Sequence, residues 1–560
     1  MKFFLLLLLF PGIATAQVPL KYVDPLIGTG PAKTSSSVRH SESGSENKGQ
    51  TYPAVGRPFG MTQWTPETGT TEDKCISPYY YNDKYITGFR GSHWMSGSCT
   101  QDYGSASLMP FSTGKPDTLK HDPYSKFNHK NEISSPVYYK VLLDNSDIIS
   151  ELTGSTRAGM MRFTFPGKTS SYILIRINND EKTGKLWIDK ERNEIAGYNP
   201  VHRIYNGKGK SAGFSGYFII RFDKPFQPIT QLMTQQKMVV CFNNEKIINV
   251  RIGTSFTSIE AARNNLDKEI PDWNFDASRK AGEDSWNQTL GKVLVKGGSQ
   301  DDLIKFYTAL YHCYQLPRIA SDYEGSYHGF AQDSAIHKAG GFDYYDDFSM
   351  WDTYRVLHPL LTILEPKRSL DMVKSLILKA QQEGWMPIFP AWGNYTAAMI
   401  GDHVSTMISD APIKGKTALN NESDHQAAYL FSMSGKPEIT QERVNKIISE
   451  EYGTGPGGLS GNDDAGQMSA WLVFSMMGFY PVCPASNQYV ITTPSFDEVK
   501  IFLPDGKIFL ISSINREKTN KYIRVITRDG GRFNDWYITH EEIVKGSRFT
   551  FQLDSRPPLK

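Results

Sequence analysis

The sequence predicts a multidomain protein of mixed β and α class, in which a large β-rich region is followed by a helical region and a short second β region. Residues 17–256 contain many short apolar runs separated by turn signals, without helical stretches between them. From residue 301 the apolar residues recur with the helical period, and after residue 488 they again form strand-like runs. The length of 560 residues allows about three or four domains.

The N-terminus has the pattern of a secretory signal peptide. Lys2 precedes an apolar run from Phe3 to Phe10, and Ala14-Thr-Ala16 forms a small-x-small cleavage site. The apolar run is too short to span a bilayer, and no cysteine follows the site as it would in a lipoprotein. We therefore expect residues 1–16 to be removed and the protein to be periplasmic or secreted, without a membrane span.

Composition narrows the classes of function. The formal net charge of +2 provides no bulk field that favours nucleic acid. Aromatic residues make up 12% of the chain, which suits a large β-rich core and also a protein that stacks rings on sugars. The five cysteines are too few and too scattered for a disulfide framework, although Cys75 and Cys99 are candidates for a single bridge.

The β-rich region 17–256 is predicted to be a large sandwich. Alternating runs such as Gly159–Phe165, Tyr172–Ile177 and Gly216–Phe222 predict its strands. Helical patterns then appear in residues 257–300, which we interpret as a helical linker.

Residues 301–487 are predicted to form a helical domain. An apolar stripe from Leu303 to Tyr314 predicts its first helix, which Pro317 ends. Further helices are predicted at 350–363, 367–382, 396–409, 424–434, 439–450 and 467–479. In residues 488–560 strand patterns return, so we expect a short C-terminal β region.

One stretch, Gly455 to Trp471, carries the strongest signal for chemistry. Its first half is a glycine-rich loop, and apolar residues on the 3/4 spacing from Gln467 to Phe479 predict a buried helix. Asn462, Asp463 and Asp464 lie at the junction between the loop and the helix. A helix cap needs one such residue and this loop carries three, so a carboxylate site and a plain cap are equal alternatives at this point.

Polar and aromatic residues also gather in four loops, and such loops are difficult to explain as core. Their mixture of rings, carboxylates and amides is typical of a sugar pocket. Local interactions are the alternative, such as an ion pair between Asp352 and Arg355 or a helix cap at Asn421 or Ser423. The candidates for substrate binding are Arg90, His93 and Trp94 in the first loop, Trp351 and Asp352 in the second, Trp392 and Asn394 in the third, and Glu422 and His425 in the fourth.

A set of motifs runs nearly from one end of the chain to the other. It consists of Val23–Gly28, Tyr52–Gly60, Gly88–Gly104, Ser349–Thr353, Trp385–Asp402, Gly457–Pro481 and Tyr537–Glu542. These motifs resemble those of glycoside hydrolase family 92, the calcium-dependent exo-acting α-mannosidases. The most specific match is the run Gly-Asn-Asp-Asp-Ala-Gly-Gln-Met-Ser-Ala-Trp that ends at Trp471.

The resemblance implies a supersandwich-like N-terminal β-sandwich followed by an (α/α)6-type helical toroid, with the active site between them. It also implies an inverting hydrolysis of mannose-containing glycans, in which one carboxylic acid protonates the leaving oxygen while another carboxylate activates water. A bound Ca²⁺ would engage the 2- and 3-hydroxyls of the mannose, and oxygen ligands suit that ion.

Carried over by position, the resemblance assigns Asp464 as the general base, with Asp463 or Asn462 helping to hold the water. It implies that Trp94, Arg90 and Trp392 contact sugar.

The fourth loop matches the family's Asn-Glu-x-x-His stretch, which lines the mannose and calcium site. Glu422 and His425 are therefore expected beside the sugar, and Asn421 and Glu422 are the expected calcium ligands. In the family a long helical segment with the general-acid glutamate precedes this stretch, whereas here Lys414–Asn420 joins the flanking parts directly. The toroid is thus expected to be incomplete, and the acid has no matching position.

The function expected from these observations is that of an exported, calcium-dependent exo-α-mannosidase. The alternative is a catalytically impaired protein that still binds mannose, because the general-acid segment is missing. A polysaccharide lyase is a third hypothesis, since lyases also combine toroids with large sheets, and its unsaturated products would reveal it. The sequence indicates neither a linkage preference nor an oligomeric state.

Overall fold

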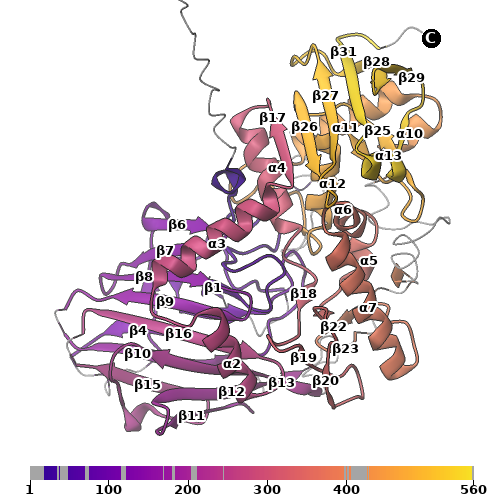
Figure 1. The fold of residues 1–560 in the computed structure, drawn as a ribbon. Coiled ribbons are helices and arrows are strands. Elements are labelled where there is room, and N and C mark those ends of the chain that lie inside the picture. Colours follow the sequence, from indigo (N-terminus) through magenta and orange to yellow (C-terminus); the bar gives the residue numbers. More distant parts are fainter. Residues whose placement is uncertain are drawn as a thin grey trace, which may run out of the picture.

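The structure, a computed structural model, shows a β region, a helical region and a second β region (Figure 1). The described residues are 18–34, 37, 48–69, 75–114, 116, 121–167, 169–178, 183–202, 211–243, 245–396, 399, 401, 403–404, 426 and 428–557. The predicted signal peptide, most of the predicted helix 396–409 and the site residues Asn421, Glu422 and His425 lie outside them. The predicted fold class, a β-rich region followed by a helical region and a second β region, is confirmed.

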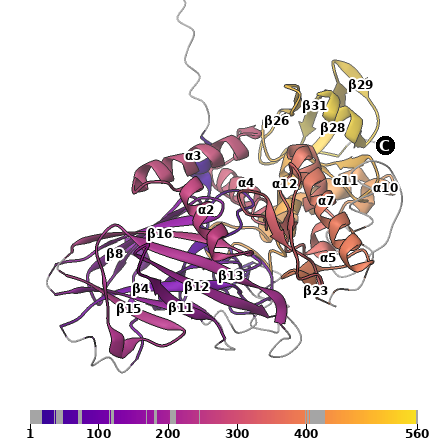
Figure 2. The same cartoon turned by 60° about the horizontal axis from the view of Figure 1, so that its bottom comes forward.

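The N-terminal region is a sandwich of two antiparallel sheets (Figures 1 and 2). Across the first sheet the strands are β1 (Gln63–Glu67), β3 (Gly88–Ser92), β4 (Ser105–Ser112), β10 (Ser171–Asn178), β15 (Lys237–Phe242) and β14 (Gln227–Pro228). Across the second they are β11 (Lys185–Asp189), β12 (Glu194–His202), β13 (Ser211–Phe222), β16 (Ile247–Ser255), β9 (Ala158–Thr164), β8 (Ile148–Gly154), β7 (Tyr138–Leu143) and β6 (Glu132–Ser135). The predicted runs lie in β9, β10 and β13, and side chains such as Phe89, Ile173 and Ile220 form the apolar core of the sandwich.

Shorter elements complete this region. A separate ladder is formed by β2 (Tyr85–Ile86) and β5 (Ser125–Lys126). Single 3-10 turns are η1 (Pro19–Tyr22), η3 (His129–Asn131) and η4 (Thr230–Leu232). The long loops between β1 and β4 carry the polar residues considered below.

The linker consists of α2 (Ile259–Glu269), α3 (Phe275–Leu290) and β17 (Val293–Lys296). Helix α2 packs on β16, where Gly253 leaves the space: a Cβ there would lie 2.2 Å from the Ala262 carbonyl oxygen. Helix α3 packs on β8 and β9, whereas β17 pairs with the C-terminal sheet. The two helices therefore cover the sandwich and the strand ties it to the other end of the chain.

The helical region follows the linker. Its helices are α4 (Gln300–His312), α5 (Met350–Thr353), α6 (Leu357–Leu364), α7 (Pro366–Glu383), α10 (Leu430–Met433), α11 (Pro437–Glu450) and α12 (Gln467–Met477). Its short ladders are β18 (Arg318–Ile319) with β21 (Tyr345–Asp346), β19 (Ser326–His328) with β20 (Ile336–Lys338), and β22 (Pro390–Ala391) with β23 (Asn394–Tyr395). The predicted helix at 350–363 is interrupted after Thr353, because Pro359 cannot donate to the carbonyl of Arg355 and its ring would clash there.

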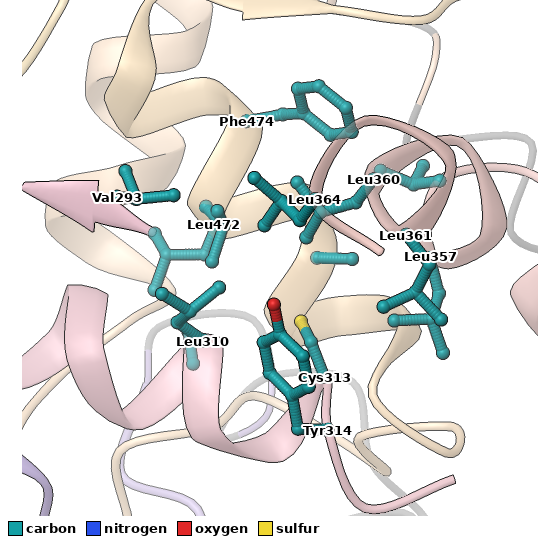
Figure 3. Packing of buried hydrophobic residues seen from close by; sticks show 14 of the residues in the cluster. Val293, Leu310, Cys313, Tyr314, Leu357, Leu360, Leu361, Leu364, Leu472 and Phe474 are labelled. Carbon is teal, nitrogen blue, oxygen red and sulfur yellow. The ribbon is translucent and has the colours of Figure 1, made fainter. Parts of the chain in front are cut away.

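Helix α12 lies at the centre of the helical region and contacts α4, α6 and α11. All its residues except Met468 are buried. Figure 3 shows Leu472 and Phe474 of this helix near Leu310 of α4 and Leu360 of α6. A helix that is apolar on all sides must be surrounded by protein, so the predicted buried helix is confirmed and is buried beyond the single predicted stripe.

The C-terminal region packs above the helices in Figure 1. Across its main sheet the strands are β17, β26 (Glu498–Phe502), β27 (Ile508–Ile514), β31 (Arg548–Asp554), β28 (Tyr522–Arg528) and β29 (Gly531–Phe533). A second sheet contains β24 (Phe479–Tyr480), β25 (Gln488–Ile491) and β30 (Tyr537–Thr539), followed by α13 (His540–Lys545).

A single apolar core passes between the regions. It includes Ile27 and Phe59 from the N-terminal loops, Tyr314 and Leu472 from the helical region, and Phe549 from the C-terminal sheet. The rings of Phe59 and Tyr314 lie 5.3 Å apart, and the Phe59 amide donates to the Tyr314 carbonyl oxygen. Such packing fixes the N-terminal loops against the helical region. Among the described residues, no helix combines the length and the apolarity needed to cross a membrane.

Candidate active site

The glycine-rich loop of the central stretch docks on the N-terminal segment. The amides of Gly28 and Gly30 donate to the carbonyl oxygen of Pro456 at 3.1 and 3.0 Å. A Cβ on Gly457 would lie 2.4 Å from the carbonyl oxygen of Pro31. The glycines therefore allow two backbones to approach closely, as the sequence predicts.

Asp463 is turned inward and is only 1% exposed. Its Oδ1 accepts hydrogen bonds from the Ser469 amide at 3.1 Å and the Ser469 hydroxyl at 2.7 Å, which satisfies a free donor in the first turn of α12. Its Oδ2 has no hydrogen-bond partner among the described residues and lies 3.7 Å from Nδ1 of His312. Burial raises the pKa of Asp463 to about 7. Of the two aspartates, Asp463 is therefore the one that caps a backbone amide in the first turn of α12.

Asp464 is partly exposed and has a different backbone. Its φ of +50° is followed by +57° at Ala465 and +90° at Gly466, three consecutive left-handed residues. The two non-glycine residues cost on the order of 1–3 kcal/mol each and persist only where the surroundings hold them. The Asp464 amide donates to the Gly97 carbonyl oxygen at 2.9 Å, and its own carbonyl oxygen accepts from Gln467 at 3.1 Å.

Gly97 is the N-terminal contact of this turn. Its φ is +83°, and a Cβ would lie 2.7 Å from Cβ of Asp463 and 2.8 Å from the Asp464 nitrogen. Its amide donates to the Gln50 carbonyl oxygen at 2.9 Å. A glycine is required here because two loops of the N-terminal region and the Asp463–Asp464 backbone meet without space for a side chain.

A disulfide joins Cys75 and Cys99, so the single bridge considered from the sequence is present. The Cys75 amide donates to the Thr100 carbonyl oxygen at 2.8 Å, which reinforces the same connection. Because Cys99 follows Gly97 by two residues, the bridge restrains the loop that holds Asp464.

Arg90 and Trp94, two predicted sugar contacts, are buried in the N-terminal region. Arg90 is 1% exposed, with Nε 3.1 Å from Oδ2 of Asp102 and one terminal nitrogen 3.9 Å from Glu67. Trp94 is 0% exposed, and its Nε1 donates to the Gln50 carbonyl oxygen at 3.4 Å. In this structure both side chains support the loop from within.

His93 is held in the same way. Its Nδ1 lies 2.7 Å from the Tyr103 carbonyl oxygen and its Nε2 lies 2.9 Å from the Thr62 hydroxyl. Burial, reinforced by the charge of Arg318, lowers the pKa of His93 to about 4. A neutral imidazole that donates from Nδ1 and accepts at Nε2 satisfies both contacts.

In the helical region, Trp351 is partly exposed and carries the Arg355 guanidinium 4.9 Å from its ring centre. Asp352 is buried and accepts a hydrogen bond from the Ser349 hydroxyl. These two neighbours differ in access, since only the tryptophan reaches solvent.

Trp392 and Asn394 lie around the β22–β23 turn. Trp392 is 1% exposed with φ +50°, and its Nε1 has no hydrogen-bond partner among the residues described. Asn394 is buried, donates to the Ala331 carbonyl oxygen at 3.3 Å and accepts from the Tyr395 amide at 2.8 Å. The indole retains a donor for a ligand, whereas the amide is occupied by backbone.

A buried ion pair that the sequence analysis missed connects these loops. Nε of Arg318 lies 2.6 Å from Oδ2 of Asp347, and one terminal nitrogen donates to the carbonyl oxygens of His93 at 2.7 Å and Trp94 at 2.8 Å. Asp347 lies five residues before the predicted site residue Asp352, but Arg318 lies in no recognisable motif. Its partners come from a distant loop, so no local signal marks it.

The structure brings several of the predicted residues together. One apolar cluster contains Met95, Tyr103, Trp392 and Ala465, with Trp351 packed against it. Trp94 and Asp464 are the chain neighbours of two of these residues, so the first loop, the Trp392 turn and the carboxylate turn converge. The described residues include no group of three or more His, Cys, Asp or Glu side chains that could hold a metal. The predicted ligands Asn421 and Glu422, and also His425, lie outside the described residues.

Solved structures share this architecture. A family 92 α-mannosidase from Bacteroides thetaiotaomicron in complex with mannoimidazole matches with a TM-score of 0.83 and 22% identity, covering 97% of this chain and 95% of that one. A family 92 inverting mannosidase from Bacteroides thetaiotaomicron VPI-5482 matches with a TM-score of 0.80 and 22% identity, covering 97% of each chain. These matches confirm the predicted fold class of a β-rich N-terminal domain followed by a helical domain.

Sequence comparison adds a curated relative and the family itself. An uncharacterized secreted glycosidase from Arthroderma benhamiae is 31% identical over 138 residues, which span 24% of this chain and only 18% of that relative. The model of the glycosyl hydrolase family 92 N-terminal domain matches residues 22–258. The model of the glycosyl hydrolase family 92 catalytic domain matches in two pieces, residues 261–420 and 413–555. The chain therefore belongs to glycoside hydrolase family 92.

Proposed function

We propose that the protein is an exported exo-acting α-mannosidase that hydrolyses mannose-containing glycans with inversion. Family membership and the fold support the reaction class. The observation that carries the proposal is the carboxylate turn: Asp464 is partly exposed, has a strained backbone and is held by Gly97 of the other domain. Strained backbone of this kind gathers at functional sites.

In the proposed reaction Asp464 is the general base. It takes a proton from water while the water oxygen attacks the anomeric carbon, and the leaving oxygen departs from the opposite face with a proton from a general acid. Asp463 has one oxygen occupied by Ser469 and is buried, so its role is to hold the turn. We assign no described residue as the acid.

Calcium is part of the proposal through the family resemblance alone. The described residues contain no cluster of three or more His, Cys, Asp or Glu side chains that could hold a metal, and the expected ligands Asn421 and Glu422 lie outside them. No step above therefore depends on the ion. If calcium contributes, mannose release or binding falls in excess chelator and returns with Ca²⁺ but not with Mg²⁺, because the smaller ion demands stricter octahedral geometry. Unchanged binding in chelator contradicts this part of the proposal.

The reaction is tested with an aryl α-mannoside and a mannobiose as parallel substrates. A nitrophenolate leaves without protonation, whereas an alkyl alcohol needs a positioned acid, which contributes about 10²–10⁴-fold. Slow cleavage of the aryl substrate alone supports a site that has lost its acid. Cleavage of both supports the proposal and reveals another acid. If Asp464→Asn loses an activity that the parent protein shows on either substrate, that activity belongs to this site.

The second candidate is a protein that binds mannose without hydrolysing its glycosides. The two-piece match to the catalytic domain favours it, because the two pieces overlap in residues 413–420, the stretch in which the family resemblance implies a missing helical segment. Calorimetric titration with mannose, with and without chelator, distinguishes this candidate: binding without turnover of either substrate supports it, and absence of binding excludes it.

A further inference from the structure

Arg318 lies where the two domains meet at the candidate active site. It is 1% exposed and belongs to β18, directly after the first helix of the helical region and its connecting turn. Its guanidinium donates to Asp347 within its own domain and to two successive carbonyl oxygens, of His93 and Trp94, in the other domain. One side chain thus joins the two loops.

Asp347 extends this connection to the rest of the site. Its Oδ2 also accepts from the Tyr103 hydroxyl at 2.7 Å, and its Oδ1 accepts from the Trp392 amide at 3.0 Å. Asp347 and Trp392 both have left-handed backbones, with φ of +60° and +50°. Non-glycine residues keep such conformations only when several contacts hold them, and the ion pair supplies those contacts.

The His93 and Trp94 carbonyl groups that Arg318 holds lie a few residues before Gly97, which contacts Asp464. Trp94 is followed by a tight turn in which the Ser98 amide donates to the Met95 carbonyl oxygen at 3.0 Å. Gly97 in this turn accepts from the Asp464 amide at 2.9 Å. A movement of the His93–Trp94 backbone therefore reaches Asp464 through one short turn.

A buried ion pair is weak evidence for stability, because the desolvation of two charges offsets much of their attraction. The guanidinium holds its partners in a fixed arrangement, because its planar fork directs several N–H donors at fixed angles. Lysine cannot reproduce that arrangement. We propose that Arg318, oriented by Asp347, is a positioning residue that sets the backbone carrying Asp464. This inference rests on the proposed function only where activity is the readout.

The experiment compares Arg318→Lys with Arg157→Lys. Arg157 is a matched control, because it is also buried and donates to a carboxylate, Glu269, and to a carbonyl oxygen, that of Ser321. Neither partner belongs to the loop 90–102 or to the carboxylate turn. Displacement of reacting groups by about 1 Å costs on the order of 100-fold in rate. We expect Arg318→Lys to lower kcat on an aryl α-mannoside by about 10- to 100-fold with little change in KM. We expect Arg157→Lys to lower Tm without lowering kcat of the folded protein.

Amide hydrogen exchange provides a readout that does not need activity. In Arg318→Lys, peptides that contain residues 94–98 and 463–466 should exchange faster than in the parent protein, whereas in Arg157→Lys they should not. Parental kcat together with parental exchange in a folded Arg318→Lys variant overturns the inference. If the parent itself hydrolyses no mannoside, the proposed function fails, and the exchange comparison alone decides whether Arg318 positions the turn.

Discussion

The candidate site has two walls that are built differently. We call the loop 90–102 the N-terminal wall, and residues 347, 392 and 463–465 the helical wall. In the N-terminal wall, the charged and imidazole side chains are paired, as in the Arg90–Asp102 pair and the two ring contacts of His93. Two small hydroxyls among its described residues, those of Ser96 and Thr100, are buried without a hydrogen-bond partner. In the helical wall, Oδ2 of Asp463 and Nε1 of Trp392 have no hydrogen-bond partner within the described part of the chain. Left-handed non-glycine residues also lie in this wall, at positions 347, 392, 464 and 465.

From this difference we infer that one wall supports the site and the other carries out binding and catalysis. Buried polar groups are normally satisfied, and unsatisfied ones suggest a place where a ligand, an ion or water completes the contacts. The charged and ring groups of the N-terminal wall are paired, so we interpret this wall as a support. The helical wall is strained and incomplete, so we expect its residues to carry binding and catalysis. Substitutions on the first side should therefore change stability, and substitution of the partly exposed Asp464 on the second side should change activity.

The largest effect is expected for Asp464→Asn. The amide cannot accept a proton from water, so turnover should fall by about 10²–10⁴-fold or more while Tm stays near the parental value. Asp463→Asn is the matched variant, with the same change one residue earlier, and should retain most of the activity. Rates on an aryl α-mannoside and thermal melts measure both. If the losses are reversed between the two variants, Asp463 is the base.

The next largest effect is expected for Arg90→Met, on stability. Removal of the guanidinium leaves the buried Asp102 carboxylate without its cationic partner, and such a loss costs about 3–5 kcal/mol. Glu67 keeps Arg176, whose terminal nitrogen lies 2.7 Å from its Oε1. A lower Tm or denaturant midpoint with an unchanged KM would indicate that Arg90 has a structural role. A raised KM with unchanged stability instead supports the sugar contact that the family resemblance implies for Arg90.

Gly97 belongs to one wall and contacts the other, so Gly97→Ala should affect both stability and activity. A left-handed alanine costs on the order of 1–3 kcal/mol, and its Cβ would press on backbone at 2.8 Å, which displaces Asp464. Gly340→Ala is the control, because no atom lies within 4 Å of a Cβ built there. We expect lower Tm and lower kcat only for Gly97→Ala. Normal kinetics in that variant show that the contact does not position the base.

The comparison also shows how far sequence reasoning reaches. Strands such as β13 and helices such as α12 are predictable, because alternation and the helical period are local signals. The break between α5 and α6 is also local, since Pro359 causes it, although the apolar pattern alone overlooks it. In these cases the cause lies within a few residues of its effect.

The division of roles in the site is not local. Asp463 and Asp464 are identical side chains in one turn, and Gly97 from the other domain packs against both and holds the Asp464 amide. Arg318 has no motif, because its main partners are two carbonyl groups and carbonyl groups leave no mark in a sequence. The burial of Arg90 likewise depends on Asp102 and Glu67, which reach it through the folding of the first sheet.

The smallest effect, when expressed per pH unit, is expected for Asp463→Asn on stability. The pKa of Asp463 is raised by burial from 3.8 to about 7, and His312, whose own pKa burial lowers to about 3, stays neutral beside it. Between about pH 4 and pH 7 the folded protein thus keeps a proton that the unfolded chain releases. The free energy of unfolding then falls as pH rises, by at most about 1.4 kcal/mol per pH unit, and levels off above the folded pKa.

An asparagine at position 463 keeps an acceptor for Ser469 and carries no charge, so it lacks this dependence. The Tm of the variant should therefore rise relative to the parent as pH increases through this window, and the difference should become constant above about pH 7. Thermal melts of both proteins at closely spaced pH values measure it. A difference that does not change with pH would show that Asp463 is ionised in the folded protein, and the inward carboxyl would then need a cation or a bound water to support it.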